Sequence, residues 1–168
     1  MQQHDLEADR VNRLRIHLSK ASFDAYANRR TIRGKWEASG SVYYTAAVVL
    51  HDRELWMDQF EPARHNDPGL RRFAMERVEL LSDPALTGVQ AIVEAETKAG
   101  MTLTARCDSP KGTPENPLTQ AEIEAKFRKG AKGRLAPAAV ESVLETVSRL
   151  EDLKSVRSLM EVLRTDAT

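Results

Sequence analysis

The sequence lacks most features that mark the common classes of secreted, membrane and nucleic-acid-binding proteins. Its 168 residues include one cysteine, Cys107, so no disulfide can form within the chain, which suits a reducing compartment. Lysine plus arginine and aspartate plus glutamate number 25 each, so no net field attracts nucleic acid or a membrane. No apolar run approaches the roughly 20 residues that span a bilayer, and no apolar leader follows Met1. We therefore expect a soluble cytoplasmic protein that binds neither nucleic acid nor membrane.

The usual signatures of catalytic and metal sites are also missing. The chain has no glycine-rich phosphate loop, no GxSxG, no CxxC and no HExxH motif. His4, His17, His51 and His65 lack the spacing of metal ligands, so we expect no metal and no cofactor. We predict that His17 is exposed on the polar face of a strand, and that Cys107 is a small buried thiol on the inward side of another.

Apolar residues that alternate with polar ones predict several β-strands. The alternation of Leu14, Ile16 and Leu18 with charged neighbours is typical of a half-buried strand. The Lys98–Gly100 segment predicts a hairpin connection, because glycine supplies a residue with positive φ. The expected strands lie at residues 14–18, 78–80, 89–96 and 102–107.

Capping signals and helical spacing predict the helices. Asn66 or Asp67 can cap a helix that has Pro68 in its first turn. Thr119 and Glu122 form a capping box before a C-terminal run of helices. The segment 19–40 shows no helical period, and we expect it to be irregular. The expected helices lie at residues 41–51, 68–74, 120–130, 137–150 and 156–163. For residues 41–51, the β-branched Val42, Val48 and Val49 leave a strand as the alternative.

Together these elements predict an α+β fold. It consists of a small, mostly antiparallel sheet with helices on one face, followed by a C-terminal helical tail. We place the α+β domain at residues 1–113 and the helical segment at 114–168, across a proline- and glycine-rich link. The apolar stripe of the helix at 137–150 must be buried, either on the chain's own sheet or against a partner or a missing domain. The sequence leaves both alternatives open.

One segment carries candidate chemistry. Arg29, Arg30, Arg33 and Lys35 lie between Tyr26 and Trp36. A solvated basic loop explains this composition best, because runs of charge usually face solvent. A nucleic-acid patch and a site for a small polycarboxylate are the alternatives, since the guanidinium fork matches a carboxylate. In a polycarboxylate site, Tyr26 would act as an acid or a hydrogen-bond donor.

Several segments resemble the MmgE/PrpD family, which includes 2-methylcitrate dehydratase and cis-aconitate decarboxylase. Residues 108–127, DSPKGTPENPLTQAEIEAKF, are similar to a family segment in which glycine and proline precede a PLT/S…E…KF pattern. Residues 41–50, SVYYTAAVVL, resemble the family's S-x-x-Y/F-x-x-A helix, and residues 143–163 resemble its closing helices. The order and spacing of these segments agree over nearly the whole chain.

The resemblance implies a larger architecture than this chain provides. Family chains have a large all-helical domain, a smaller α+β lid and closing helices that pack on the helical domain. This chain resembles the lid and the closing helices. It would be the C-terminal part or subunit of a lyase that dehydrates or decarboxylates a small polycarboxylate, inactive without an all-helical N-terminal domain or subunit. The alternative function is a non-catalytic binding module that retains the lid fold. A second copy of the chain, in a homo-oligomer, is counted among its candidate partners.

The resemblance also implies candidate site residues. The segment Tyr26-Ala-Asn-Arg29 resembles a Y-x-N-R segment in the family, which makes Tyr26 the candidate catalytic or substrate-orienting residue and Arg29 a carboxylate contact. Ser41 is a candidate helix cap or substrate contact. The sequence departs from the family at residues 30–32, where prolines are usual, and at residues 52–53, where a glycine is usual. The family's histidine, aspartate and lysine site residues have no counterpart here.

Overall fold

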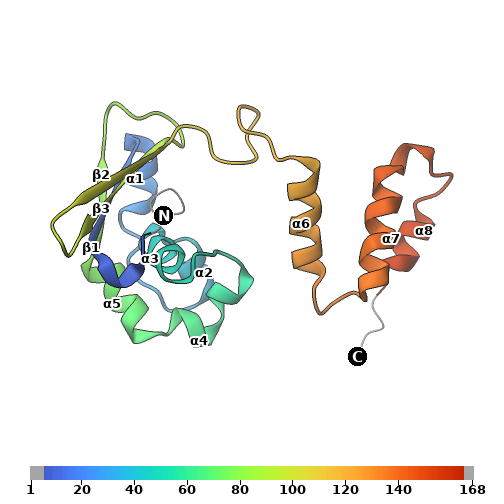
Figure 1. Cartoon of the computed structure of the whole chain (residues 1–168), viewed down its shortest axis with the longest axis horizontal. Coiled ribbons are helices and arrows are strands. Elements are labelled where there is room, and N and C mark those ends of the chain that lie inside the picture. The colour runs from blue at the N-terminus through green and yellow to red at the C-terminus, as the bar shows by residue number, and fades with distance from the viewer. Residues whose placement is uncertain (1–5, 165–168) are drawn as a thin grey trace. The chain divides into compact units, whose positions relative to one another are not determined.

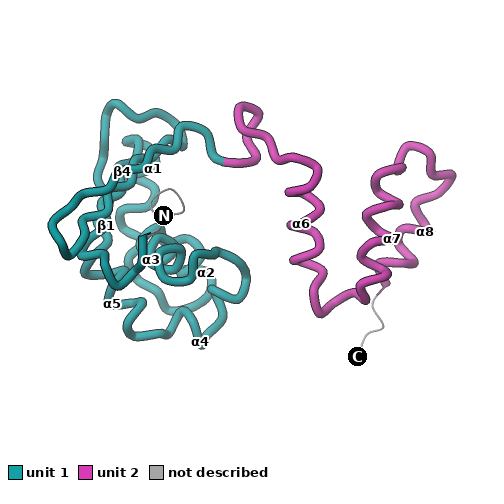
Figure 2. The backbone as a smooth tube through the Cα atoms, viewed as in Figure 1, with its two compact units in different colours: residues 1–110 teal, residues 111–168 magenta. Residues whose placement is uncertain are grey.

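The structure, a computed structural model, describes residues 6–164. Among the sequence features considered above, His4 lies outside these residues. The chain forms two compact units, residues 1–110 and residues 111–168 (Figure 2). Each unit has its own set of secondary-structure elements.

Unit 1 is an α+β domain built around one four-stranded sheet (Figure 1). Its elements follow the order η1 (Ala8–Arg10), β1 (Val11–Leu18), α1 (Lys20–Tyr26), α2 (Lys35–Ser39), α3 (Val42–Asp52), η2 (Met57–Phe60), α4 (Pro62–His65), α5 (Pro68–Glu76), β2 (Val78–Ser82), β3 (Ala91–Thr97) and β4 (Thr102–Cys107).

The sheet has the strand order β2-β1-β3-β4. The pairs β1–β3 and β3–β4 are antiparallel, whereas β1 and β2 run parallel, with Leu14 opposite Val78. The sheet is therefore mixed, and two of its three pairings are antiparallel as expected. The segment from α1 to α5 makes the long connection that parallel neighbours require.

The two faces of the sheet differ in chemistry. Apolar side chains of β1 and β2, including Leu14, Ile16 and Leu80, form one buried core with α3 and α5. On the opposite face, Arg15 lies within 3.9 Å of carboxylate oxygens on three neighbouring strand residues, Glu79, Glu94 and Glu96. Side chains alternate between faces along a strand, so one face packs under the helices and the other remains charged and partly exposed.

Helices α3 and α5 begin at side-chain caps that the sequence encodes locally. The Asp67 carboxylate accepts a hydrogen bond from the Leu70 N–H at 2.7 Å, and Pro68 occupies the first turn of α5. Ser41 precedes α3, and its hydroxyl oxygen accepts from the Tyr44 N–H at 3.4 Å. These two helices pack on each other and hold the core on one side of the sheet.

The expectation that residues 19–40 are irregular is wrong. Two short helices, α1 and α2, occupy much of this segment. Ser19 caps α1, and its hydroxyl also donates to the Gly88 carbonyl at 2.6 Å. Helices this short show little of the apolar period on which the prediction depends, and packing on the sheet stabilises them instead.

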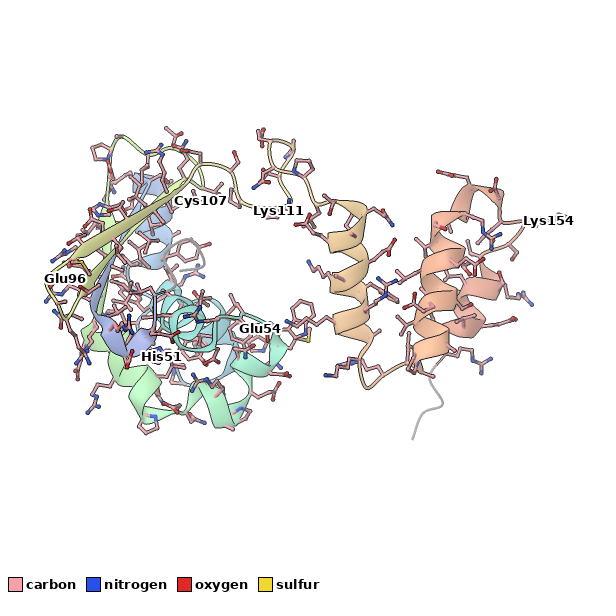
Figure 3. The ribbon with its side chains drawn as sticks, viewed as in Figure 1. His51, Glu54, Glu96, Cys107, Lys111 and Lys154 are labelled. Carbon is pink, nitrogen blue, oxygen red and sulfur yellow. The ribbon has the colours of Figure 1, made fainter. Side chains whose placement is uncertain are left out.

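Two predictions of burial are also wrong. Cys107 pairs with Ala91 across β3–β4 and so shares the helix-facing side, but it is exposed at the end of an edge strand (Figure 3). The His17 side chain, expected to be exposed, retains only 22% exposure and lies 3.5 Å from Glu94. Its Nε2 atom is buried and has no hydrogen-bond partner within residues 6–164. Neighbouring strands cover the ring although it lies on the polar face.

Unit 2 contains α6 (Gln120–Ala131), α7 (Pro137–Ser148), η3 (Leu150–Asp152) and α8 (Arg157–Val162). The predicted capping box is present, because the Thr119 N–H donates to the Glu122 carboxylate at 2.8 Å and the Thr119 hydroxyl oxygen accepts from the Glu122 N–H at 3.3 Å. The helix expected at residues 120–130 extends one residue further, so Gly130 lies inside it, and Gly133 follows its end with φ 75°. In the described part of the chain, no helix is long and apolar enough to cross a membrane.

Candidate functional site

Tyr26 and Arg29 meet at a tight turn that follows α1. Tyr26 is the last residue of α1, and its carbonyl oxygen accepts from the Arg29 N–H at 3.0 Å. The turn places the Arg29 guanidinium carbon 4.9 Å from the centroid of the Tyr26 ring, within the range of a cation–π contact. The Tyr26 ring is partly buried against the core, whereas Arg29 is exposed. A phenol and a guanidinium therefore stand together at the surface of unit 1.

Two side chains at the start of α3 fix the backbone of this turn. The Ser41 hydroxyl donates to the Arg29 carbonyl at 2.7 Å, and the Tyr43 hydroxyl donates to the Ala27 carbonyl at 2.9 Å. Both side chains are almost completely buried. Because these bonds are shielded from water, they hold the turn in one position relative to α3.

Two arginines connect the same segment to α5. Arg30 donates to the Met75 carbonyl at 2.6 Å and stacks over the Tyr43 ring, 4.4 Å from its centroid. Arg71 donates to the Ile32 carbonyl at 2.7 Å. The segment is therefore attached to both large helices of the unit, which preorganises the side chains that it carries.

Gly40 leaves room for the Arg29 guanidinium. A Cβ atom built at Gly40 would lie 3.2 Å from Arg29 Nη1, closer than most van der Waals contacts. The side chain of Arg29 thus lies against bare backbone on one side and against Tyr26 on the other. This close approach limits the positions that the guanidinium can adopt.

The cations of the basic segment have different partners. Arg33 pairs with Glu37 at 3.1 Å, and Lys35 pairs with Glu61 at 2.6 Å. Arg29 has no acidic partner among residues 6–164, and the hydroxyl of Tyr26 forms no hydrogen bond with them. Among the cations of this segment, Arg29 is thus the one best placed to receive an anion from outside the domain, with the phenol of Tyr26 beside it.

The arrangement can bind a carboxylate and orient it. The guanidinium of Arg29 can donate two parallel hydrogen bonds to a carboxylate, and the Tyr26 hydroxyl can donate a third. Ser41 is positioned differently. Its side chain is fully buried, and its hydroxyl both caps α3 and anchors the Arg29 carbonyl. The capping role is therefore observed, while direct contact of Ser41 with a substrate stays a prediction, as do the roles of Tyr26 and Arg29.

Sequence reasoning missed the residues that hold the turn in place. Tyr43 and Arg71 each donate to a carbonyl at least 16 residues away in the sequence. No short-range pattern encodes such pairings. The sequence offers one indirect signal for Tyr43. It lies two residues after Ser41, at the start of the helix expected at residues 41–51.

Comparison with known proteins identifies a family model and two relatives to which the chain is similar. Residues 1–152 match the family model described as the MmgE/PrpD C-terminal domain. Human (Homo sapiens) cis-aconitate decarboxylase is 29% identical over 163 residues, covering 95% of this chain and 33% of that protein. Mouse (Mus musculus) cis-aconitate decarboxylase is 28% identical over 161 residues, covering 94% of this chain and 32% of that protein. The chain spans about a third of the length of these curated relatives.

Proposed function

The chain belongs to the MmgE/PrpD family, and on this premise we propose that it is the C-terminal part or subunit of a lyase acting on a small polycarboxylate. The reaction would be dehydration or decarboxylation. Two relatives carry the name cis-aconitate decarboxylase, and cis-aconitate is a tricarboxylate. Because the chain spans about a third of those relatives, the proposed activity requires a complementary, all-helical N-terminal domain or subunit.

The observation that carries this proposal, beyond family membership, is the position of Arg29. Its guanidinium is exposed, lacks an acidic partner within the described residues and stacks on the Tyr26 ring at 4.9 Å. The backbone beneath it is fixed by Ser41 and Tyr43. A preorganised cation beside a phenol is suited to binding one carboxylate of a larger acid while another part of that acid reacts.

These two residues would supply only part of the chemistry. Decarboxylation breaks a carbon–carbon bond, leaves the electron pair on carbon and requires a proton there, whereas dehydration removes a proton and a hydroxyl group. Either reaction needs an acid–base group in addition to the cations that face the carboxylates. We propose that Arg29 orients the substrate, that Tyr26 donates a hydrogen bond or a proton to it, and that the complementary part supplies the other groups.

The isolated chain provides the first test. We expect no turnover of cis-aconitate or 2-methylcitrate, monitored by NMR, and weak binding of cis-aconitate that Arg29→Gln abolishes. Arg134→Gln is the matched control, because Arg134 is an exposed arginine of unit 2 whose side chain forms no hydrogen bond or ion pair in the described part of the chain. Turnover by the chain alone would show that its site is complete. NMR shifts of residues 26–41 on addition of cis-aconitate that survive Arg29→Gln would exclude Arg29 as the carboxylate contact.

A non-catalytic binding module is the second candidate function. The observation that favours it is the apolar surface of unit 2, where Val147, Leu150, Val156 and Met160 are each between 46% and 61% exposed. An interaction module would use such a surface for a protein partner. Mass measurement in solution, combined with the binding assay above, separates the two functions. A monomer that does not bind cis-aconitate would favour the module, whereas Arg29-dependent binding would favour the lyase.

A further inference from the structure

Unit 1 contains a polar cavity that is separate from the turn at Tyr26 and Arg29. Its volume is about 350 Å³, and neither Tyr26 nor Arg29 lines it. The walls come from η1, the C-terminal end of α3, helix α5 and the turn between β3 and β4. Figure 3 labels His51, which contributes to the wall at the end of α3.

Three cations on these walls lack an acidic partner. Arg72 and Arg77 come from α5 and its C-terminal cap, and Lys98 comes from the β3–β4 turn. None of the three forms an ion pair with a carboxylate within residues 6–164. Positive groups from two distant segments of the chain therefore converge on one hollow.

Apart from these three cations, the charged side chains on the walls are Arg64, Asp67 and Asp9. Arg64 donates to both oxygens of the Asp52 carboxylate and lies 3.4 Å from Asp67, and these bonds keep its pKa above the ordinary value. Asp67 is further engaged as the cap of α5. Asp9 is the one other carboxylate on the walls. Three cations thus face one carboxylate, and the excess favours an anion.

The groups that carry the excess charge are attached to rigid backbone. The Arg77 guanidinium lies 6.0 Å from the Phe73 ring centroid, and its backbone carbonyl accepts from the Leu14 N–H at 2.8 Å. The Lys98 N–H donates to the Arg10 carbonyl at 2.8 Å. Because these backbone bonds fix two walls of the cavity, little ordering would be needed before an anion binds.

His51 adds a polar group of defined orientation. Its Nδ1 lies 2.8 Å from the Ala47 carbonyl, and its ring meets Phe73 edge-on at 5.0 Å. A carbonyl oxygen only accepts hydrogen bonds, so the proton of the neutral ring resides on Nδ1. This assignment leaves Nε2 as an acceptor for a hydroxyl group on a bound ligand.

We propose that this cavity binds a small multivalent oxyanion, with Arg72, Arg77 and Lys98 as the cationic contacts. Phosphate and hydroxyl-bearing polycarboxylates share the chemistry that the walls require, namely several negative oxygens and a hydroxyl donor for His51. The volume accommodates either. This site does not depend on the proposed function at Tyr26 and Arg29.

Inorganic phosphate and citrate, titrated separately into the full chain at physiological ionic strength, test the proposal. We expect saturable binding of at least one of them by calorimetry, with NMR shifts concentrated at α5 and the β3–β4 turn. The double variant Arg72→Gln/Lys98→Gln should weaken binding by about tenfold or more, because each charge-assisted contact contributes a substantial free energy. Both side chains are exposed, and neither forms a hydrogen bond or an ion pair with residues 6–164, so the fold should be unaffected.

Two controls separate this site from the one proposed above. Arg134→Gln removes one positive charge from unit 2 and should leave the affinity for both anions unchanged. Both titrations are repeated in the Arg29→Gln background, which removes the carboxylate contact proposed above, and the double variant should still weaken the saturable binding that remains there. Binding of phosphate alone would identify a phosphate site, and binding of citrate alone a polycarboxylate site. The absence of saturable binding by both anions would overturn the proposal. Equal losses of affinity in the double variant and in Arg134→Gln would overturn it too, because they would indicate non-specific attraction.

Discussion

Ser41 illustrates how one small side chain can serve two parts of the domain. Its hydroxyl oxygen accepts from the Tyr44 N–H at the start of α3, and its proton is donated to the Arg29 carbonyl. The side chain is completely buried, and the bond to the Tyr44 N–H is buried as well. The beginning of α3 and the position of the candidate site are therefore coupled through one oxygen atom.

Replacement of Ser41 by alanine should lower the stability of unit 1 considerably, although it removes a single oxygen atom. We expect Ser41→Ala to lower the free energy of unfolding by about 1–2 kcal/mol, because it removes a helix cap and leaves the Arg29 carbonyl without its hydrogen-bond donor. Urea denaturation measures this loss. Ser39→Ala is the matched control, since the exposed Ser39 hydroxyl donates within residues 6–164 to the Trp36 carbonyl alone. Equal losses in the two variants would show that the buried bonds contribute nothing particular.

Tyr44 should make the free energy of unfolding depend on pH in the alkaline range. Burial raises the pKa of its phenol to about 12, above the ordinary value of 10.0, and its hydroxyl donates to the Gln59 carbonyl. A phenol whose pKa is higher in the folded state contributes stability that is complete below pH 10 and is lost as the pH rises towards 12. Tyr44→Phe removes this contribution together with the hydrogen bond.

The difference in stability between the native chain and Tyr44→Phe should therefore depend on pH. We expect the native chain to be more stable at neutral pH by about 1 kcal/mol, the contribution of a typical hydrogen bond. This advantage should shrink as the pH rises above 10, because only the native chain loses stability through this phenol. Urea denaturation followed by circular dichroism at several pH values measures both chains. An advantage that stays constant between neutral pH and pH 11 would contradict the raised pKa.

At the residue scale, the sequence predicts those contacts whose partners lie close along the chain. The cap at Asp67, with Pro68 after it, could be predicted because both partners lie within one helical turn. The exposure of Cys107 could not, since the alternation along β4 gives the face of a side chain but not whether the end of the strand is covered. The bond from Tyr43 to Ala27 was equally inaccessible, because only the folded chain brings the two residues together.

At the scale of the element, the capping box of α6 is the clearest case of local encoding. Thr119 and Glu122 exchange hydrogen bonds between side chain and backbone in both directions. The Thr119 N–H also keeps the pKa of the Glu122 carboxyl below its ordinary value. The box is therefore complete near neutral pH and is lost as the pH falls through that lowered pKa.

Thr119→Ala should loosen the start of α6 without affecting unit 1. We expect amide exchange at residues 120–123 to accelerate several-fold, because a lost N-cap costs a helix about 1 kcal/mol. Hydrogen exchange followed by NMR provides the measurement. Thr119→Ser, which retains the hydroxyl, should exchange at the native rate. If both variants behaved like the native chain, the box would not stabilise this helix in solution.

Helices and strands differ in how strongly the local sequence predicts them. The hairpin of β3 and β4 combines alternation with Gly100 at φ 82°, so its location could be predicted from local pattern alone. Helices α1 and α2 have seven and five residues, too few to display an amphipathic period. Their existence depends on contacts with the sheet and α3, which a local pattern does not contain.

At the scale of the whole molecule, the two units differ in how much apolar surface they bury. Unit 1 has a continuous core drawn from its sheet and helices. In the described part of unit 2, the buried apolar side chains are Ala131, Val140 and Val143. Burial of apolar surface is the main driving force of folding, so the units should differ in independent stability.

Separate expression of the two units tests this difference. We expect residues 1–110 to unfold in a cooperative thermal transition, and residues 111–168 to show a broad transition without a baseline. Circular dichroism melts of both pieces and of the full chain provide the measurement. Cooperative unfolding of residues 111–168 alone would show that unit 2 needs no further surface to cover its exposed apolar side chains.

The parallel pair at the edge of the sheet has a consequence for the kinetics of folding. The hairpin joins Ala95 to Leu103, which are close along the chain, whereas β1 meets β2 by joining Leu14 to Val78. Closing the longer loop costs more conformational entropy before any contact compensates for it. The hairpin should therefore form early and the parallel pair late. Until β2 arrives, one edge of β1 remains open to strands from other chains, so slow docking of β2 sets the period in which the protein is most prone to aggregate.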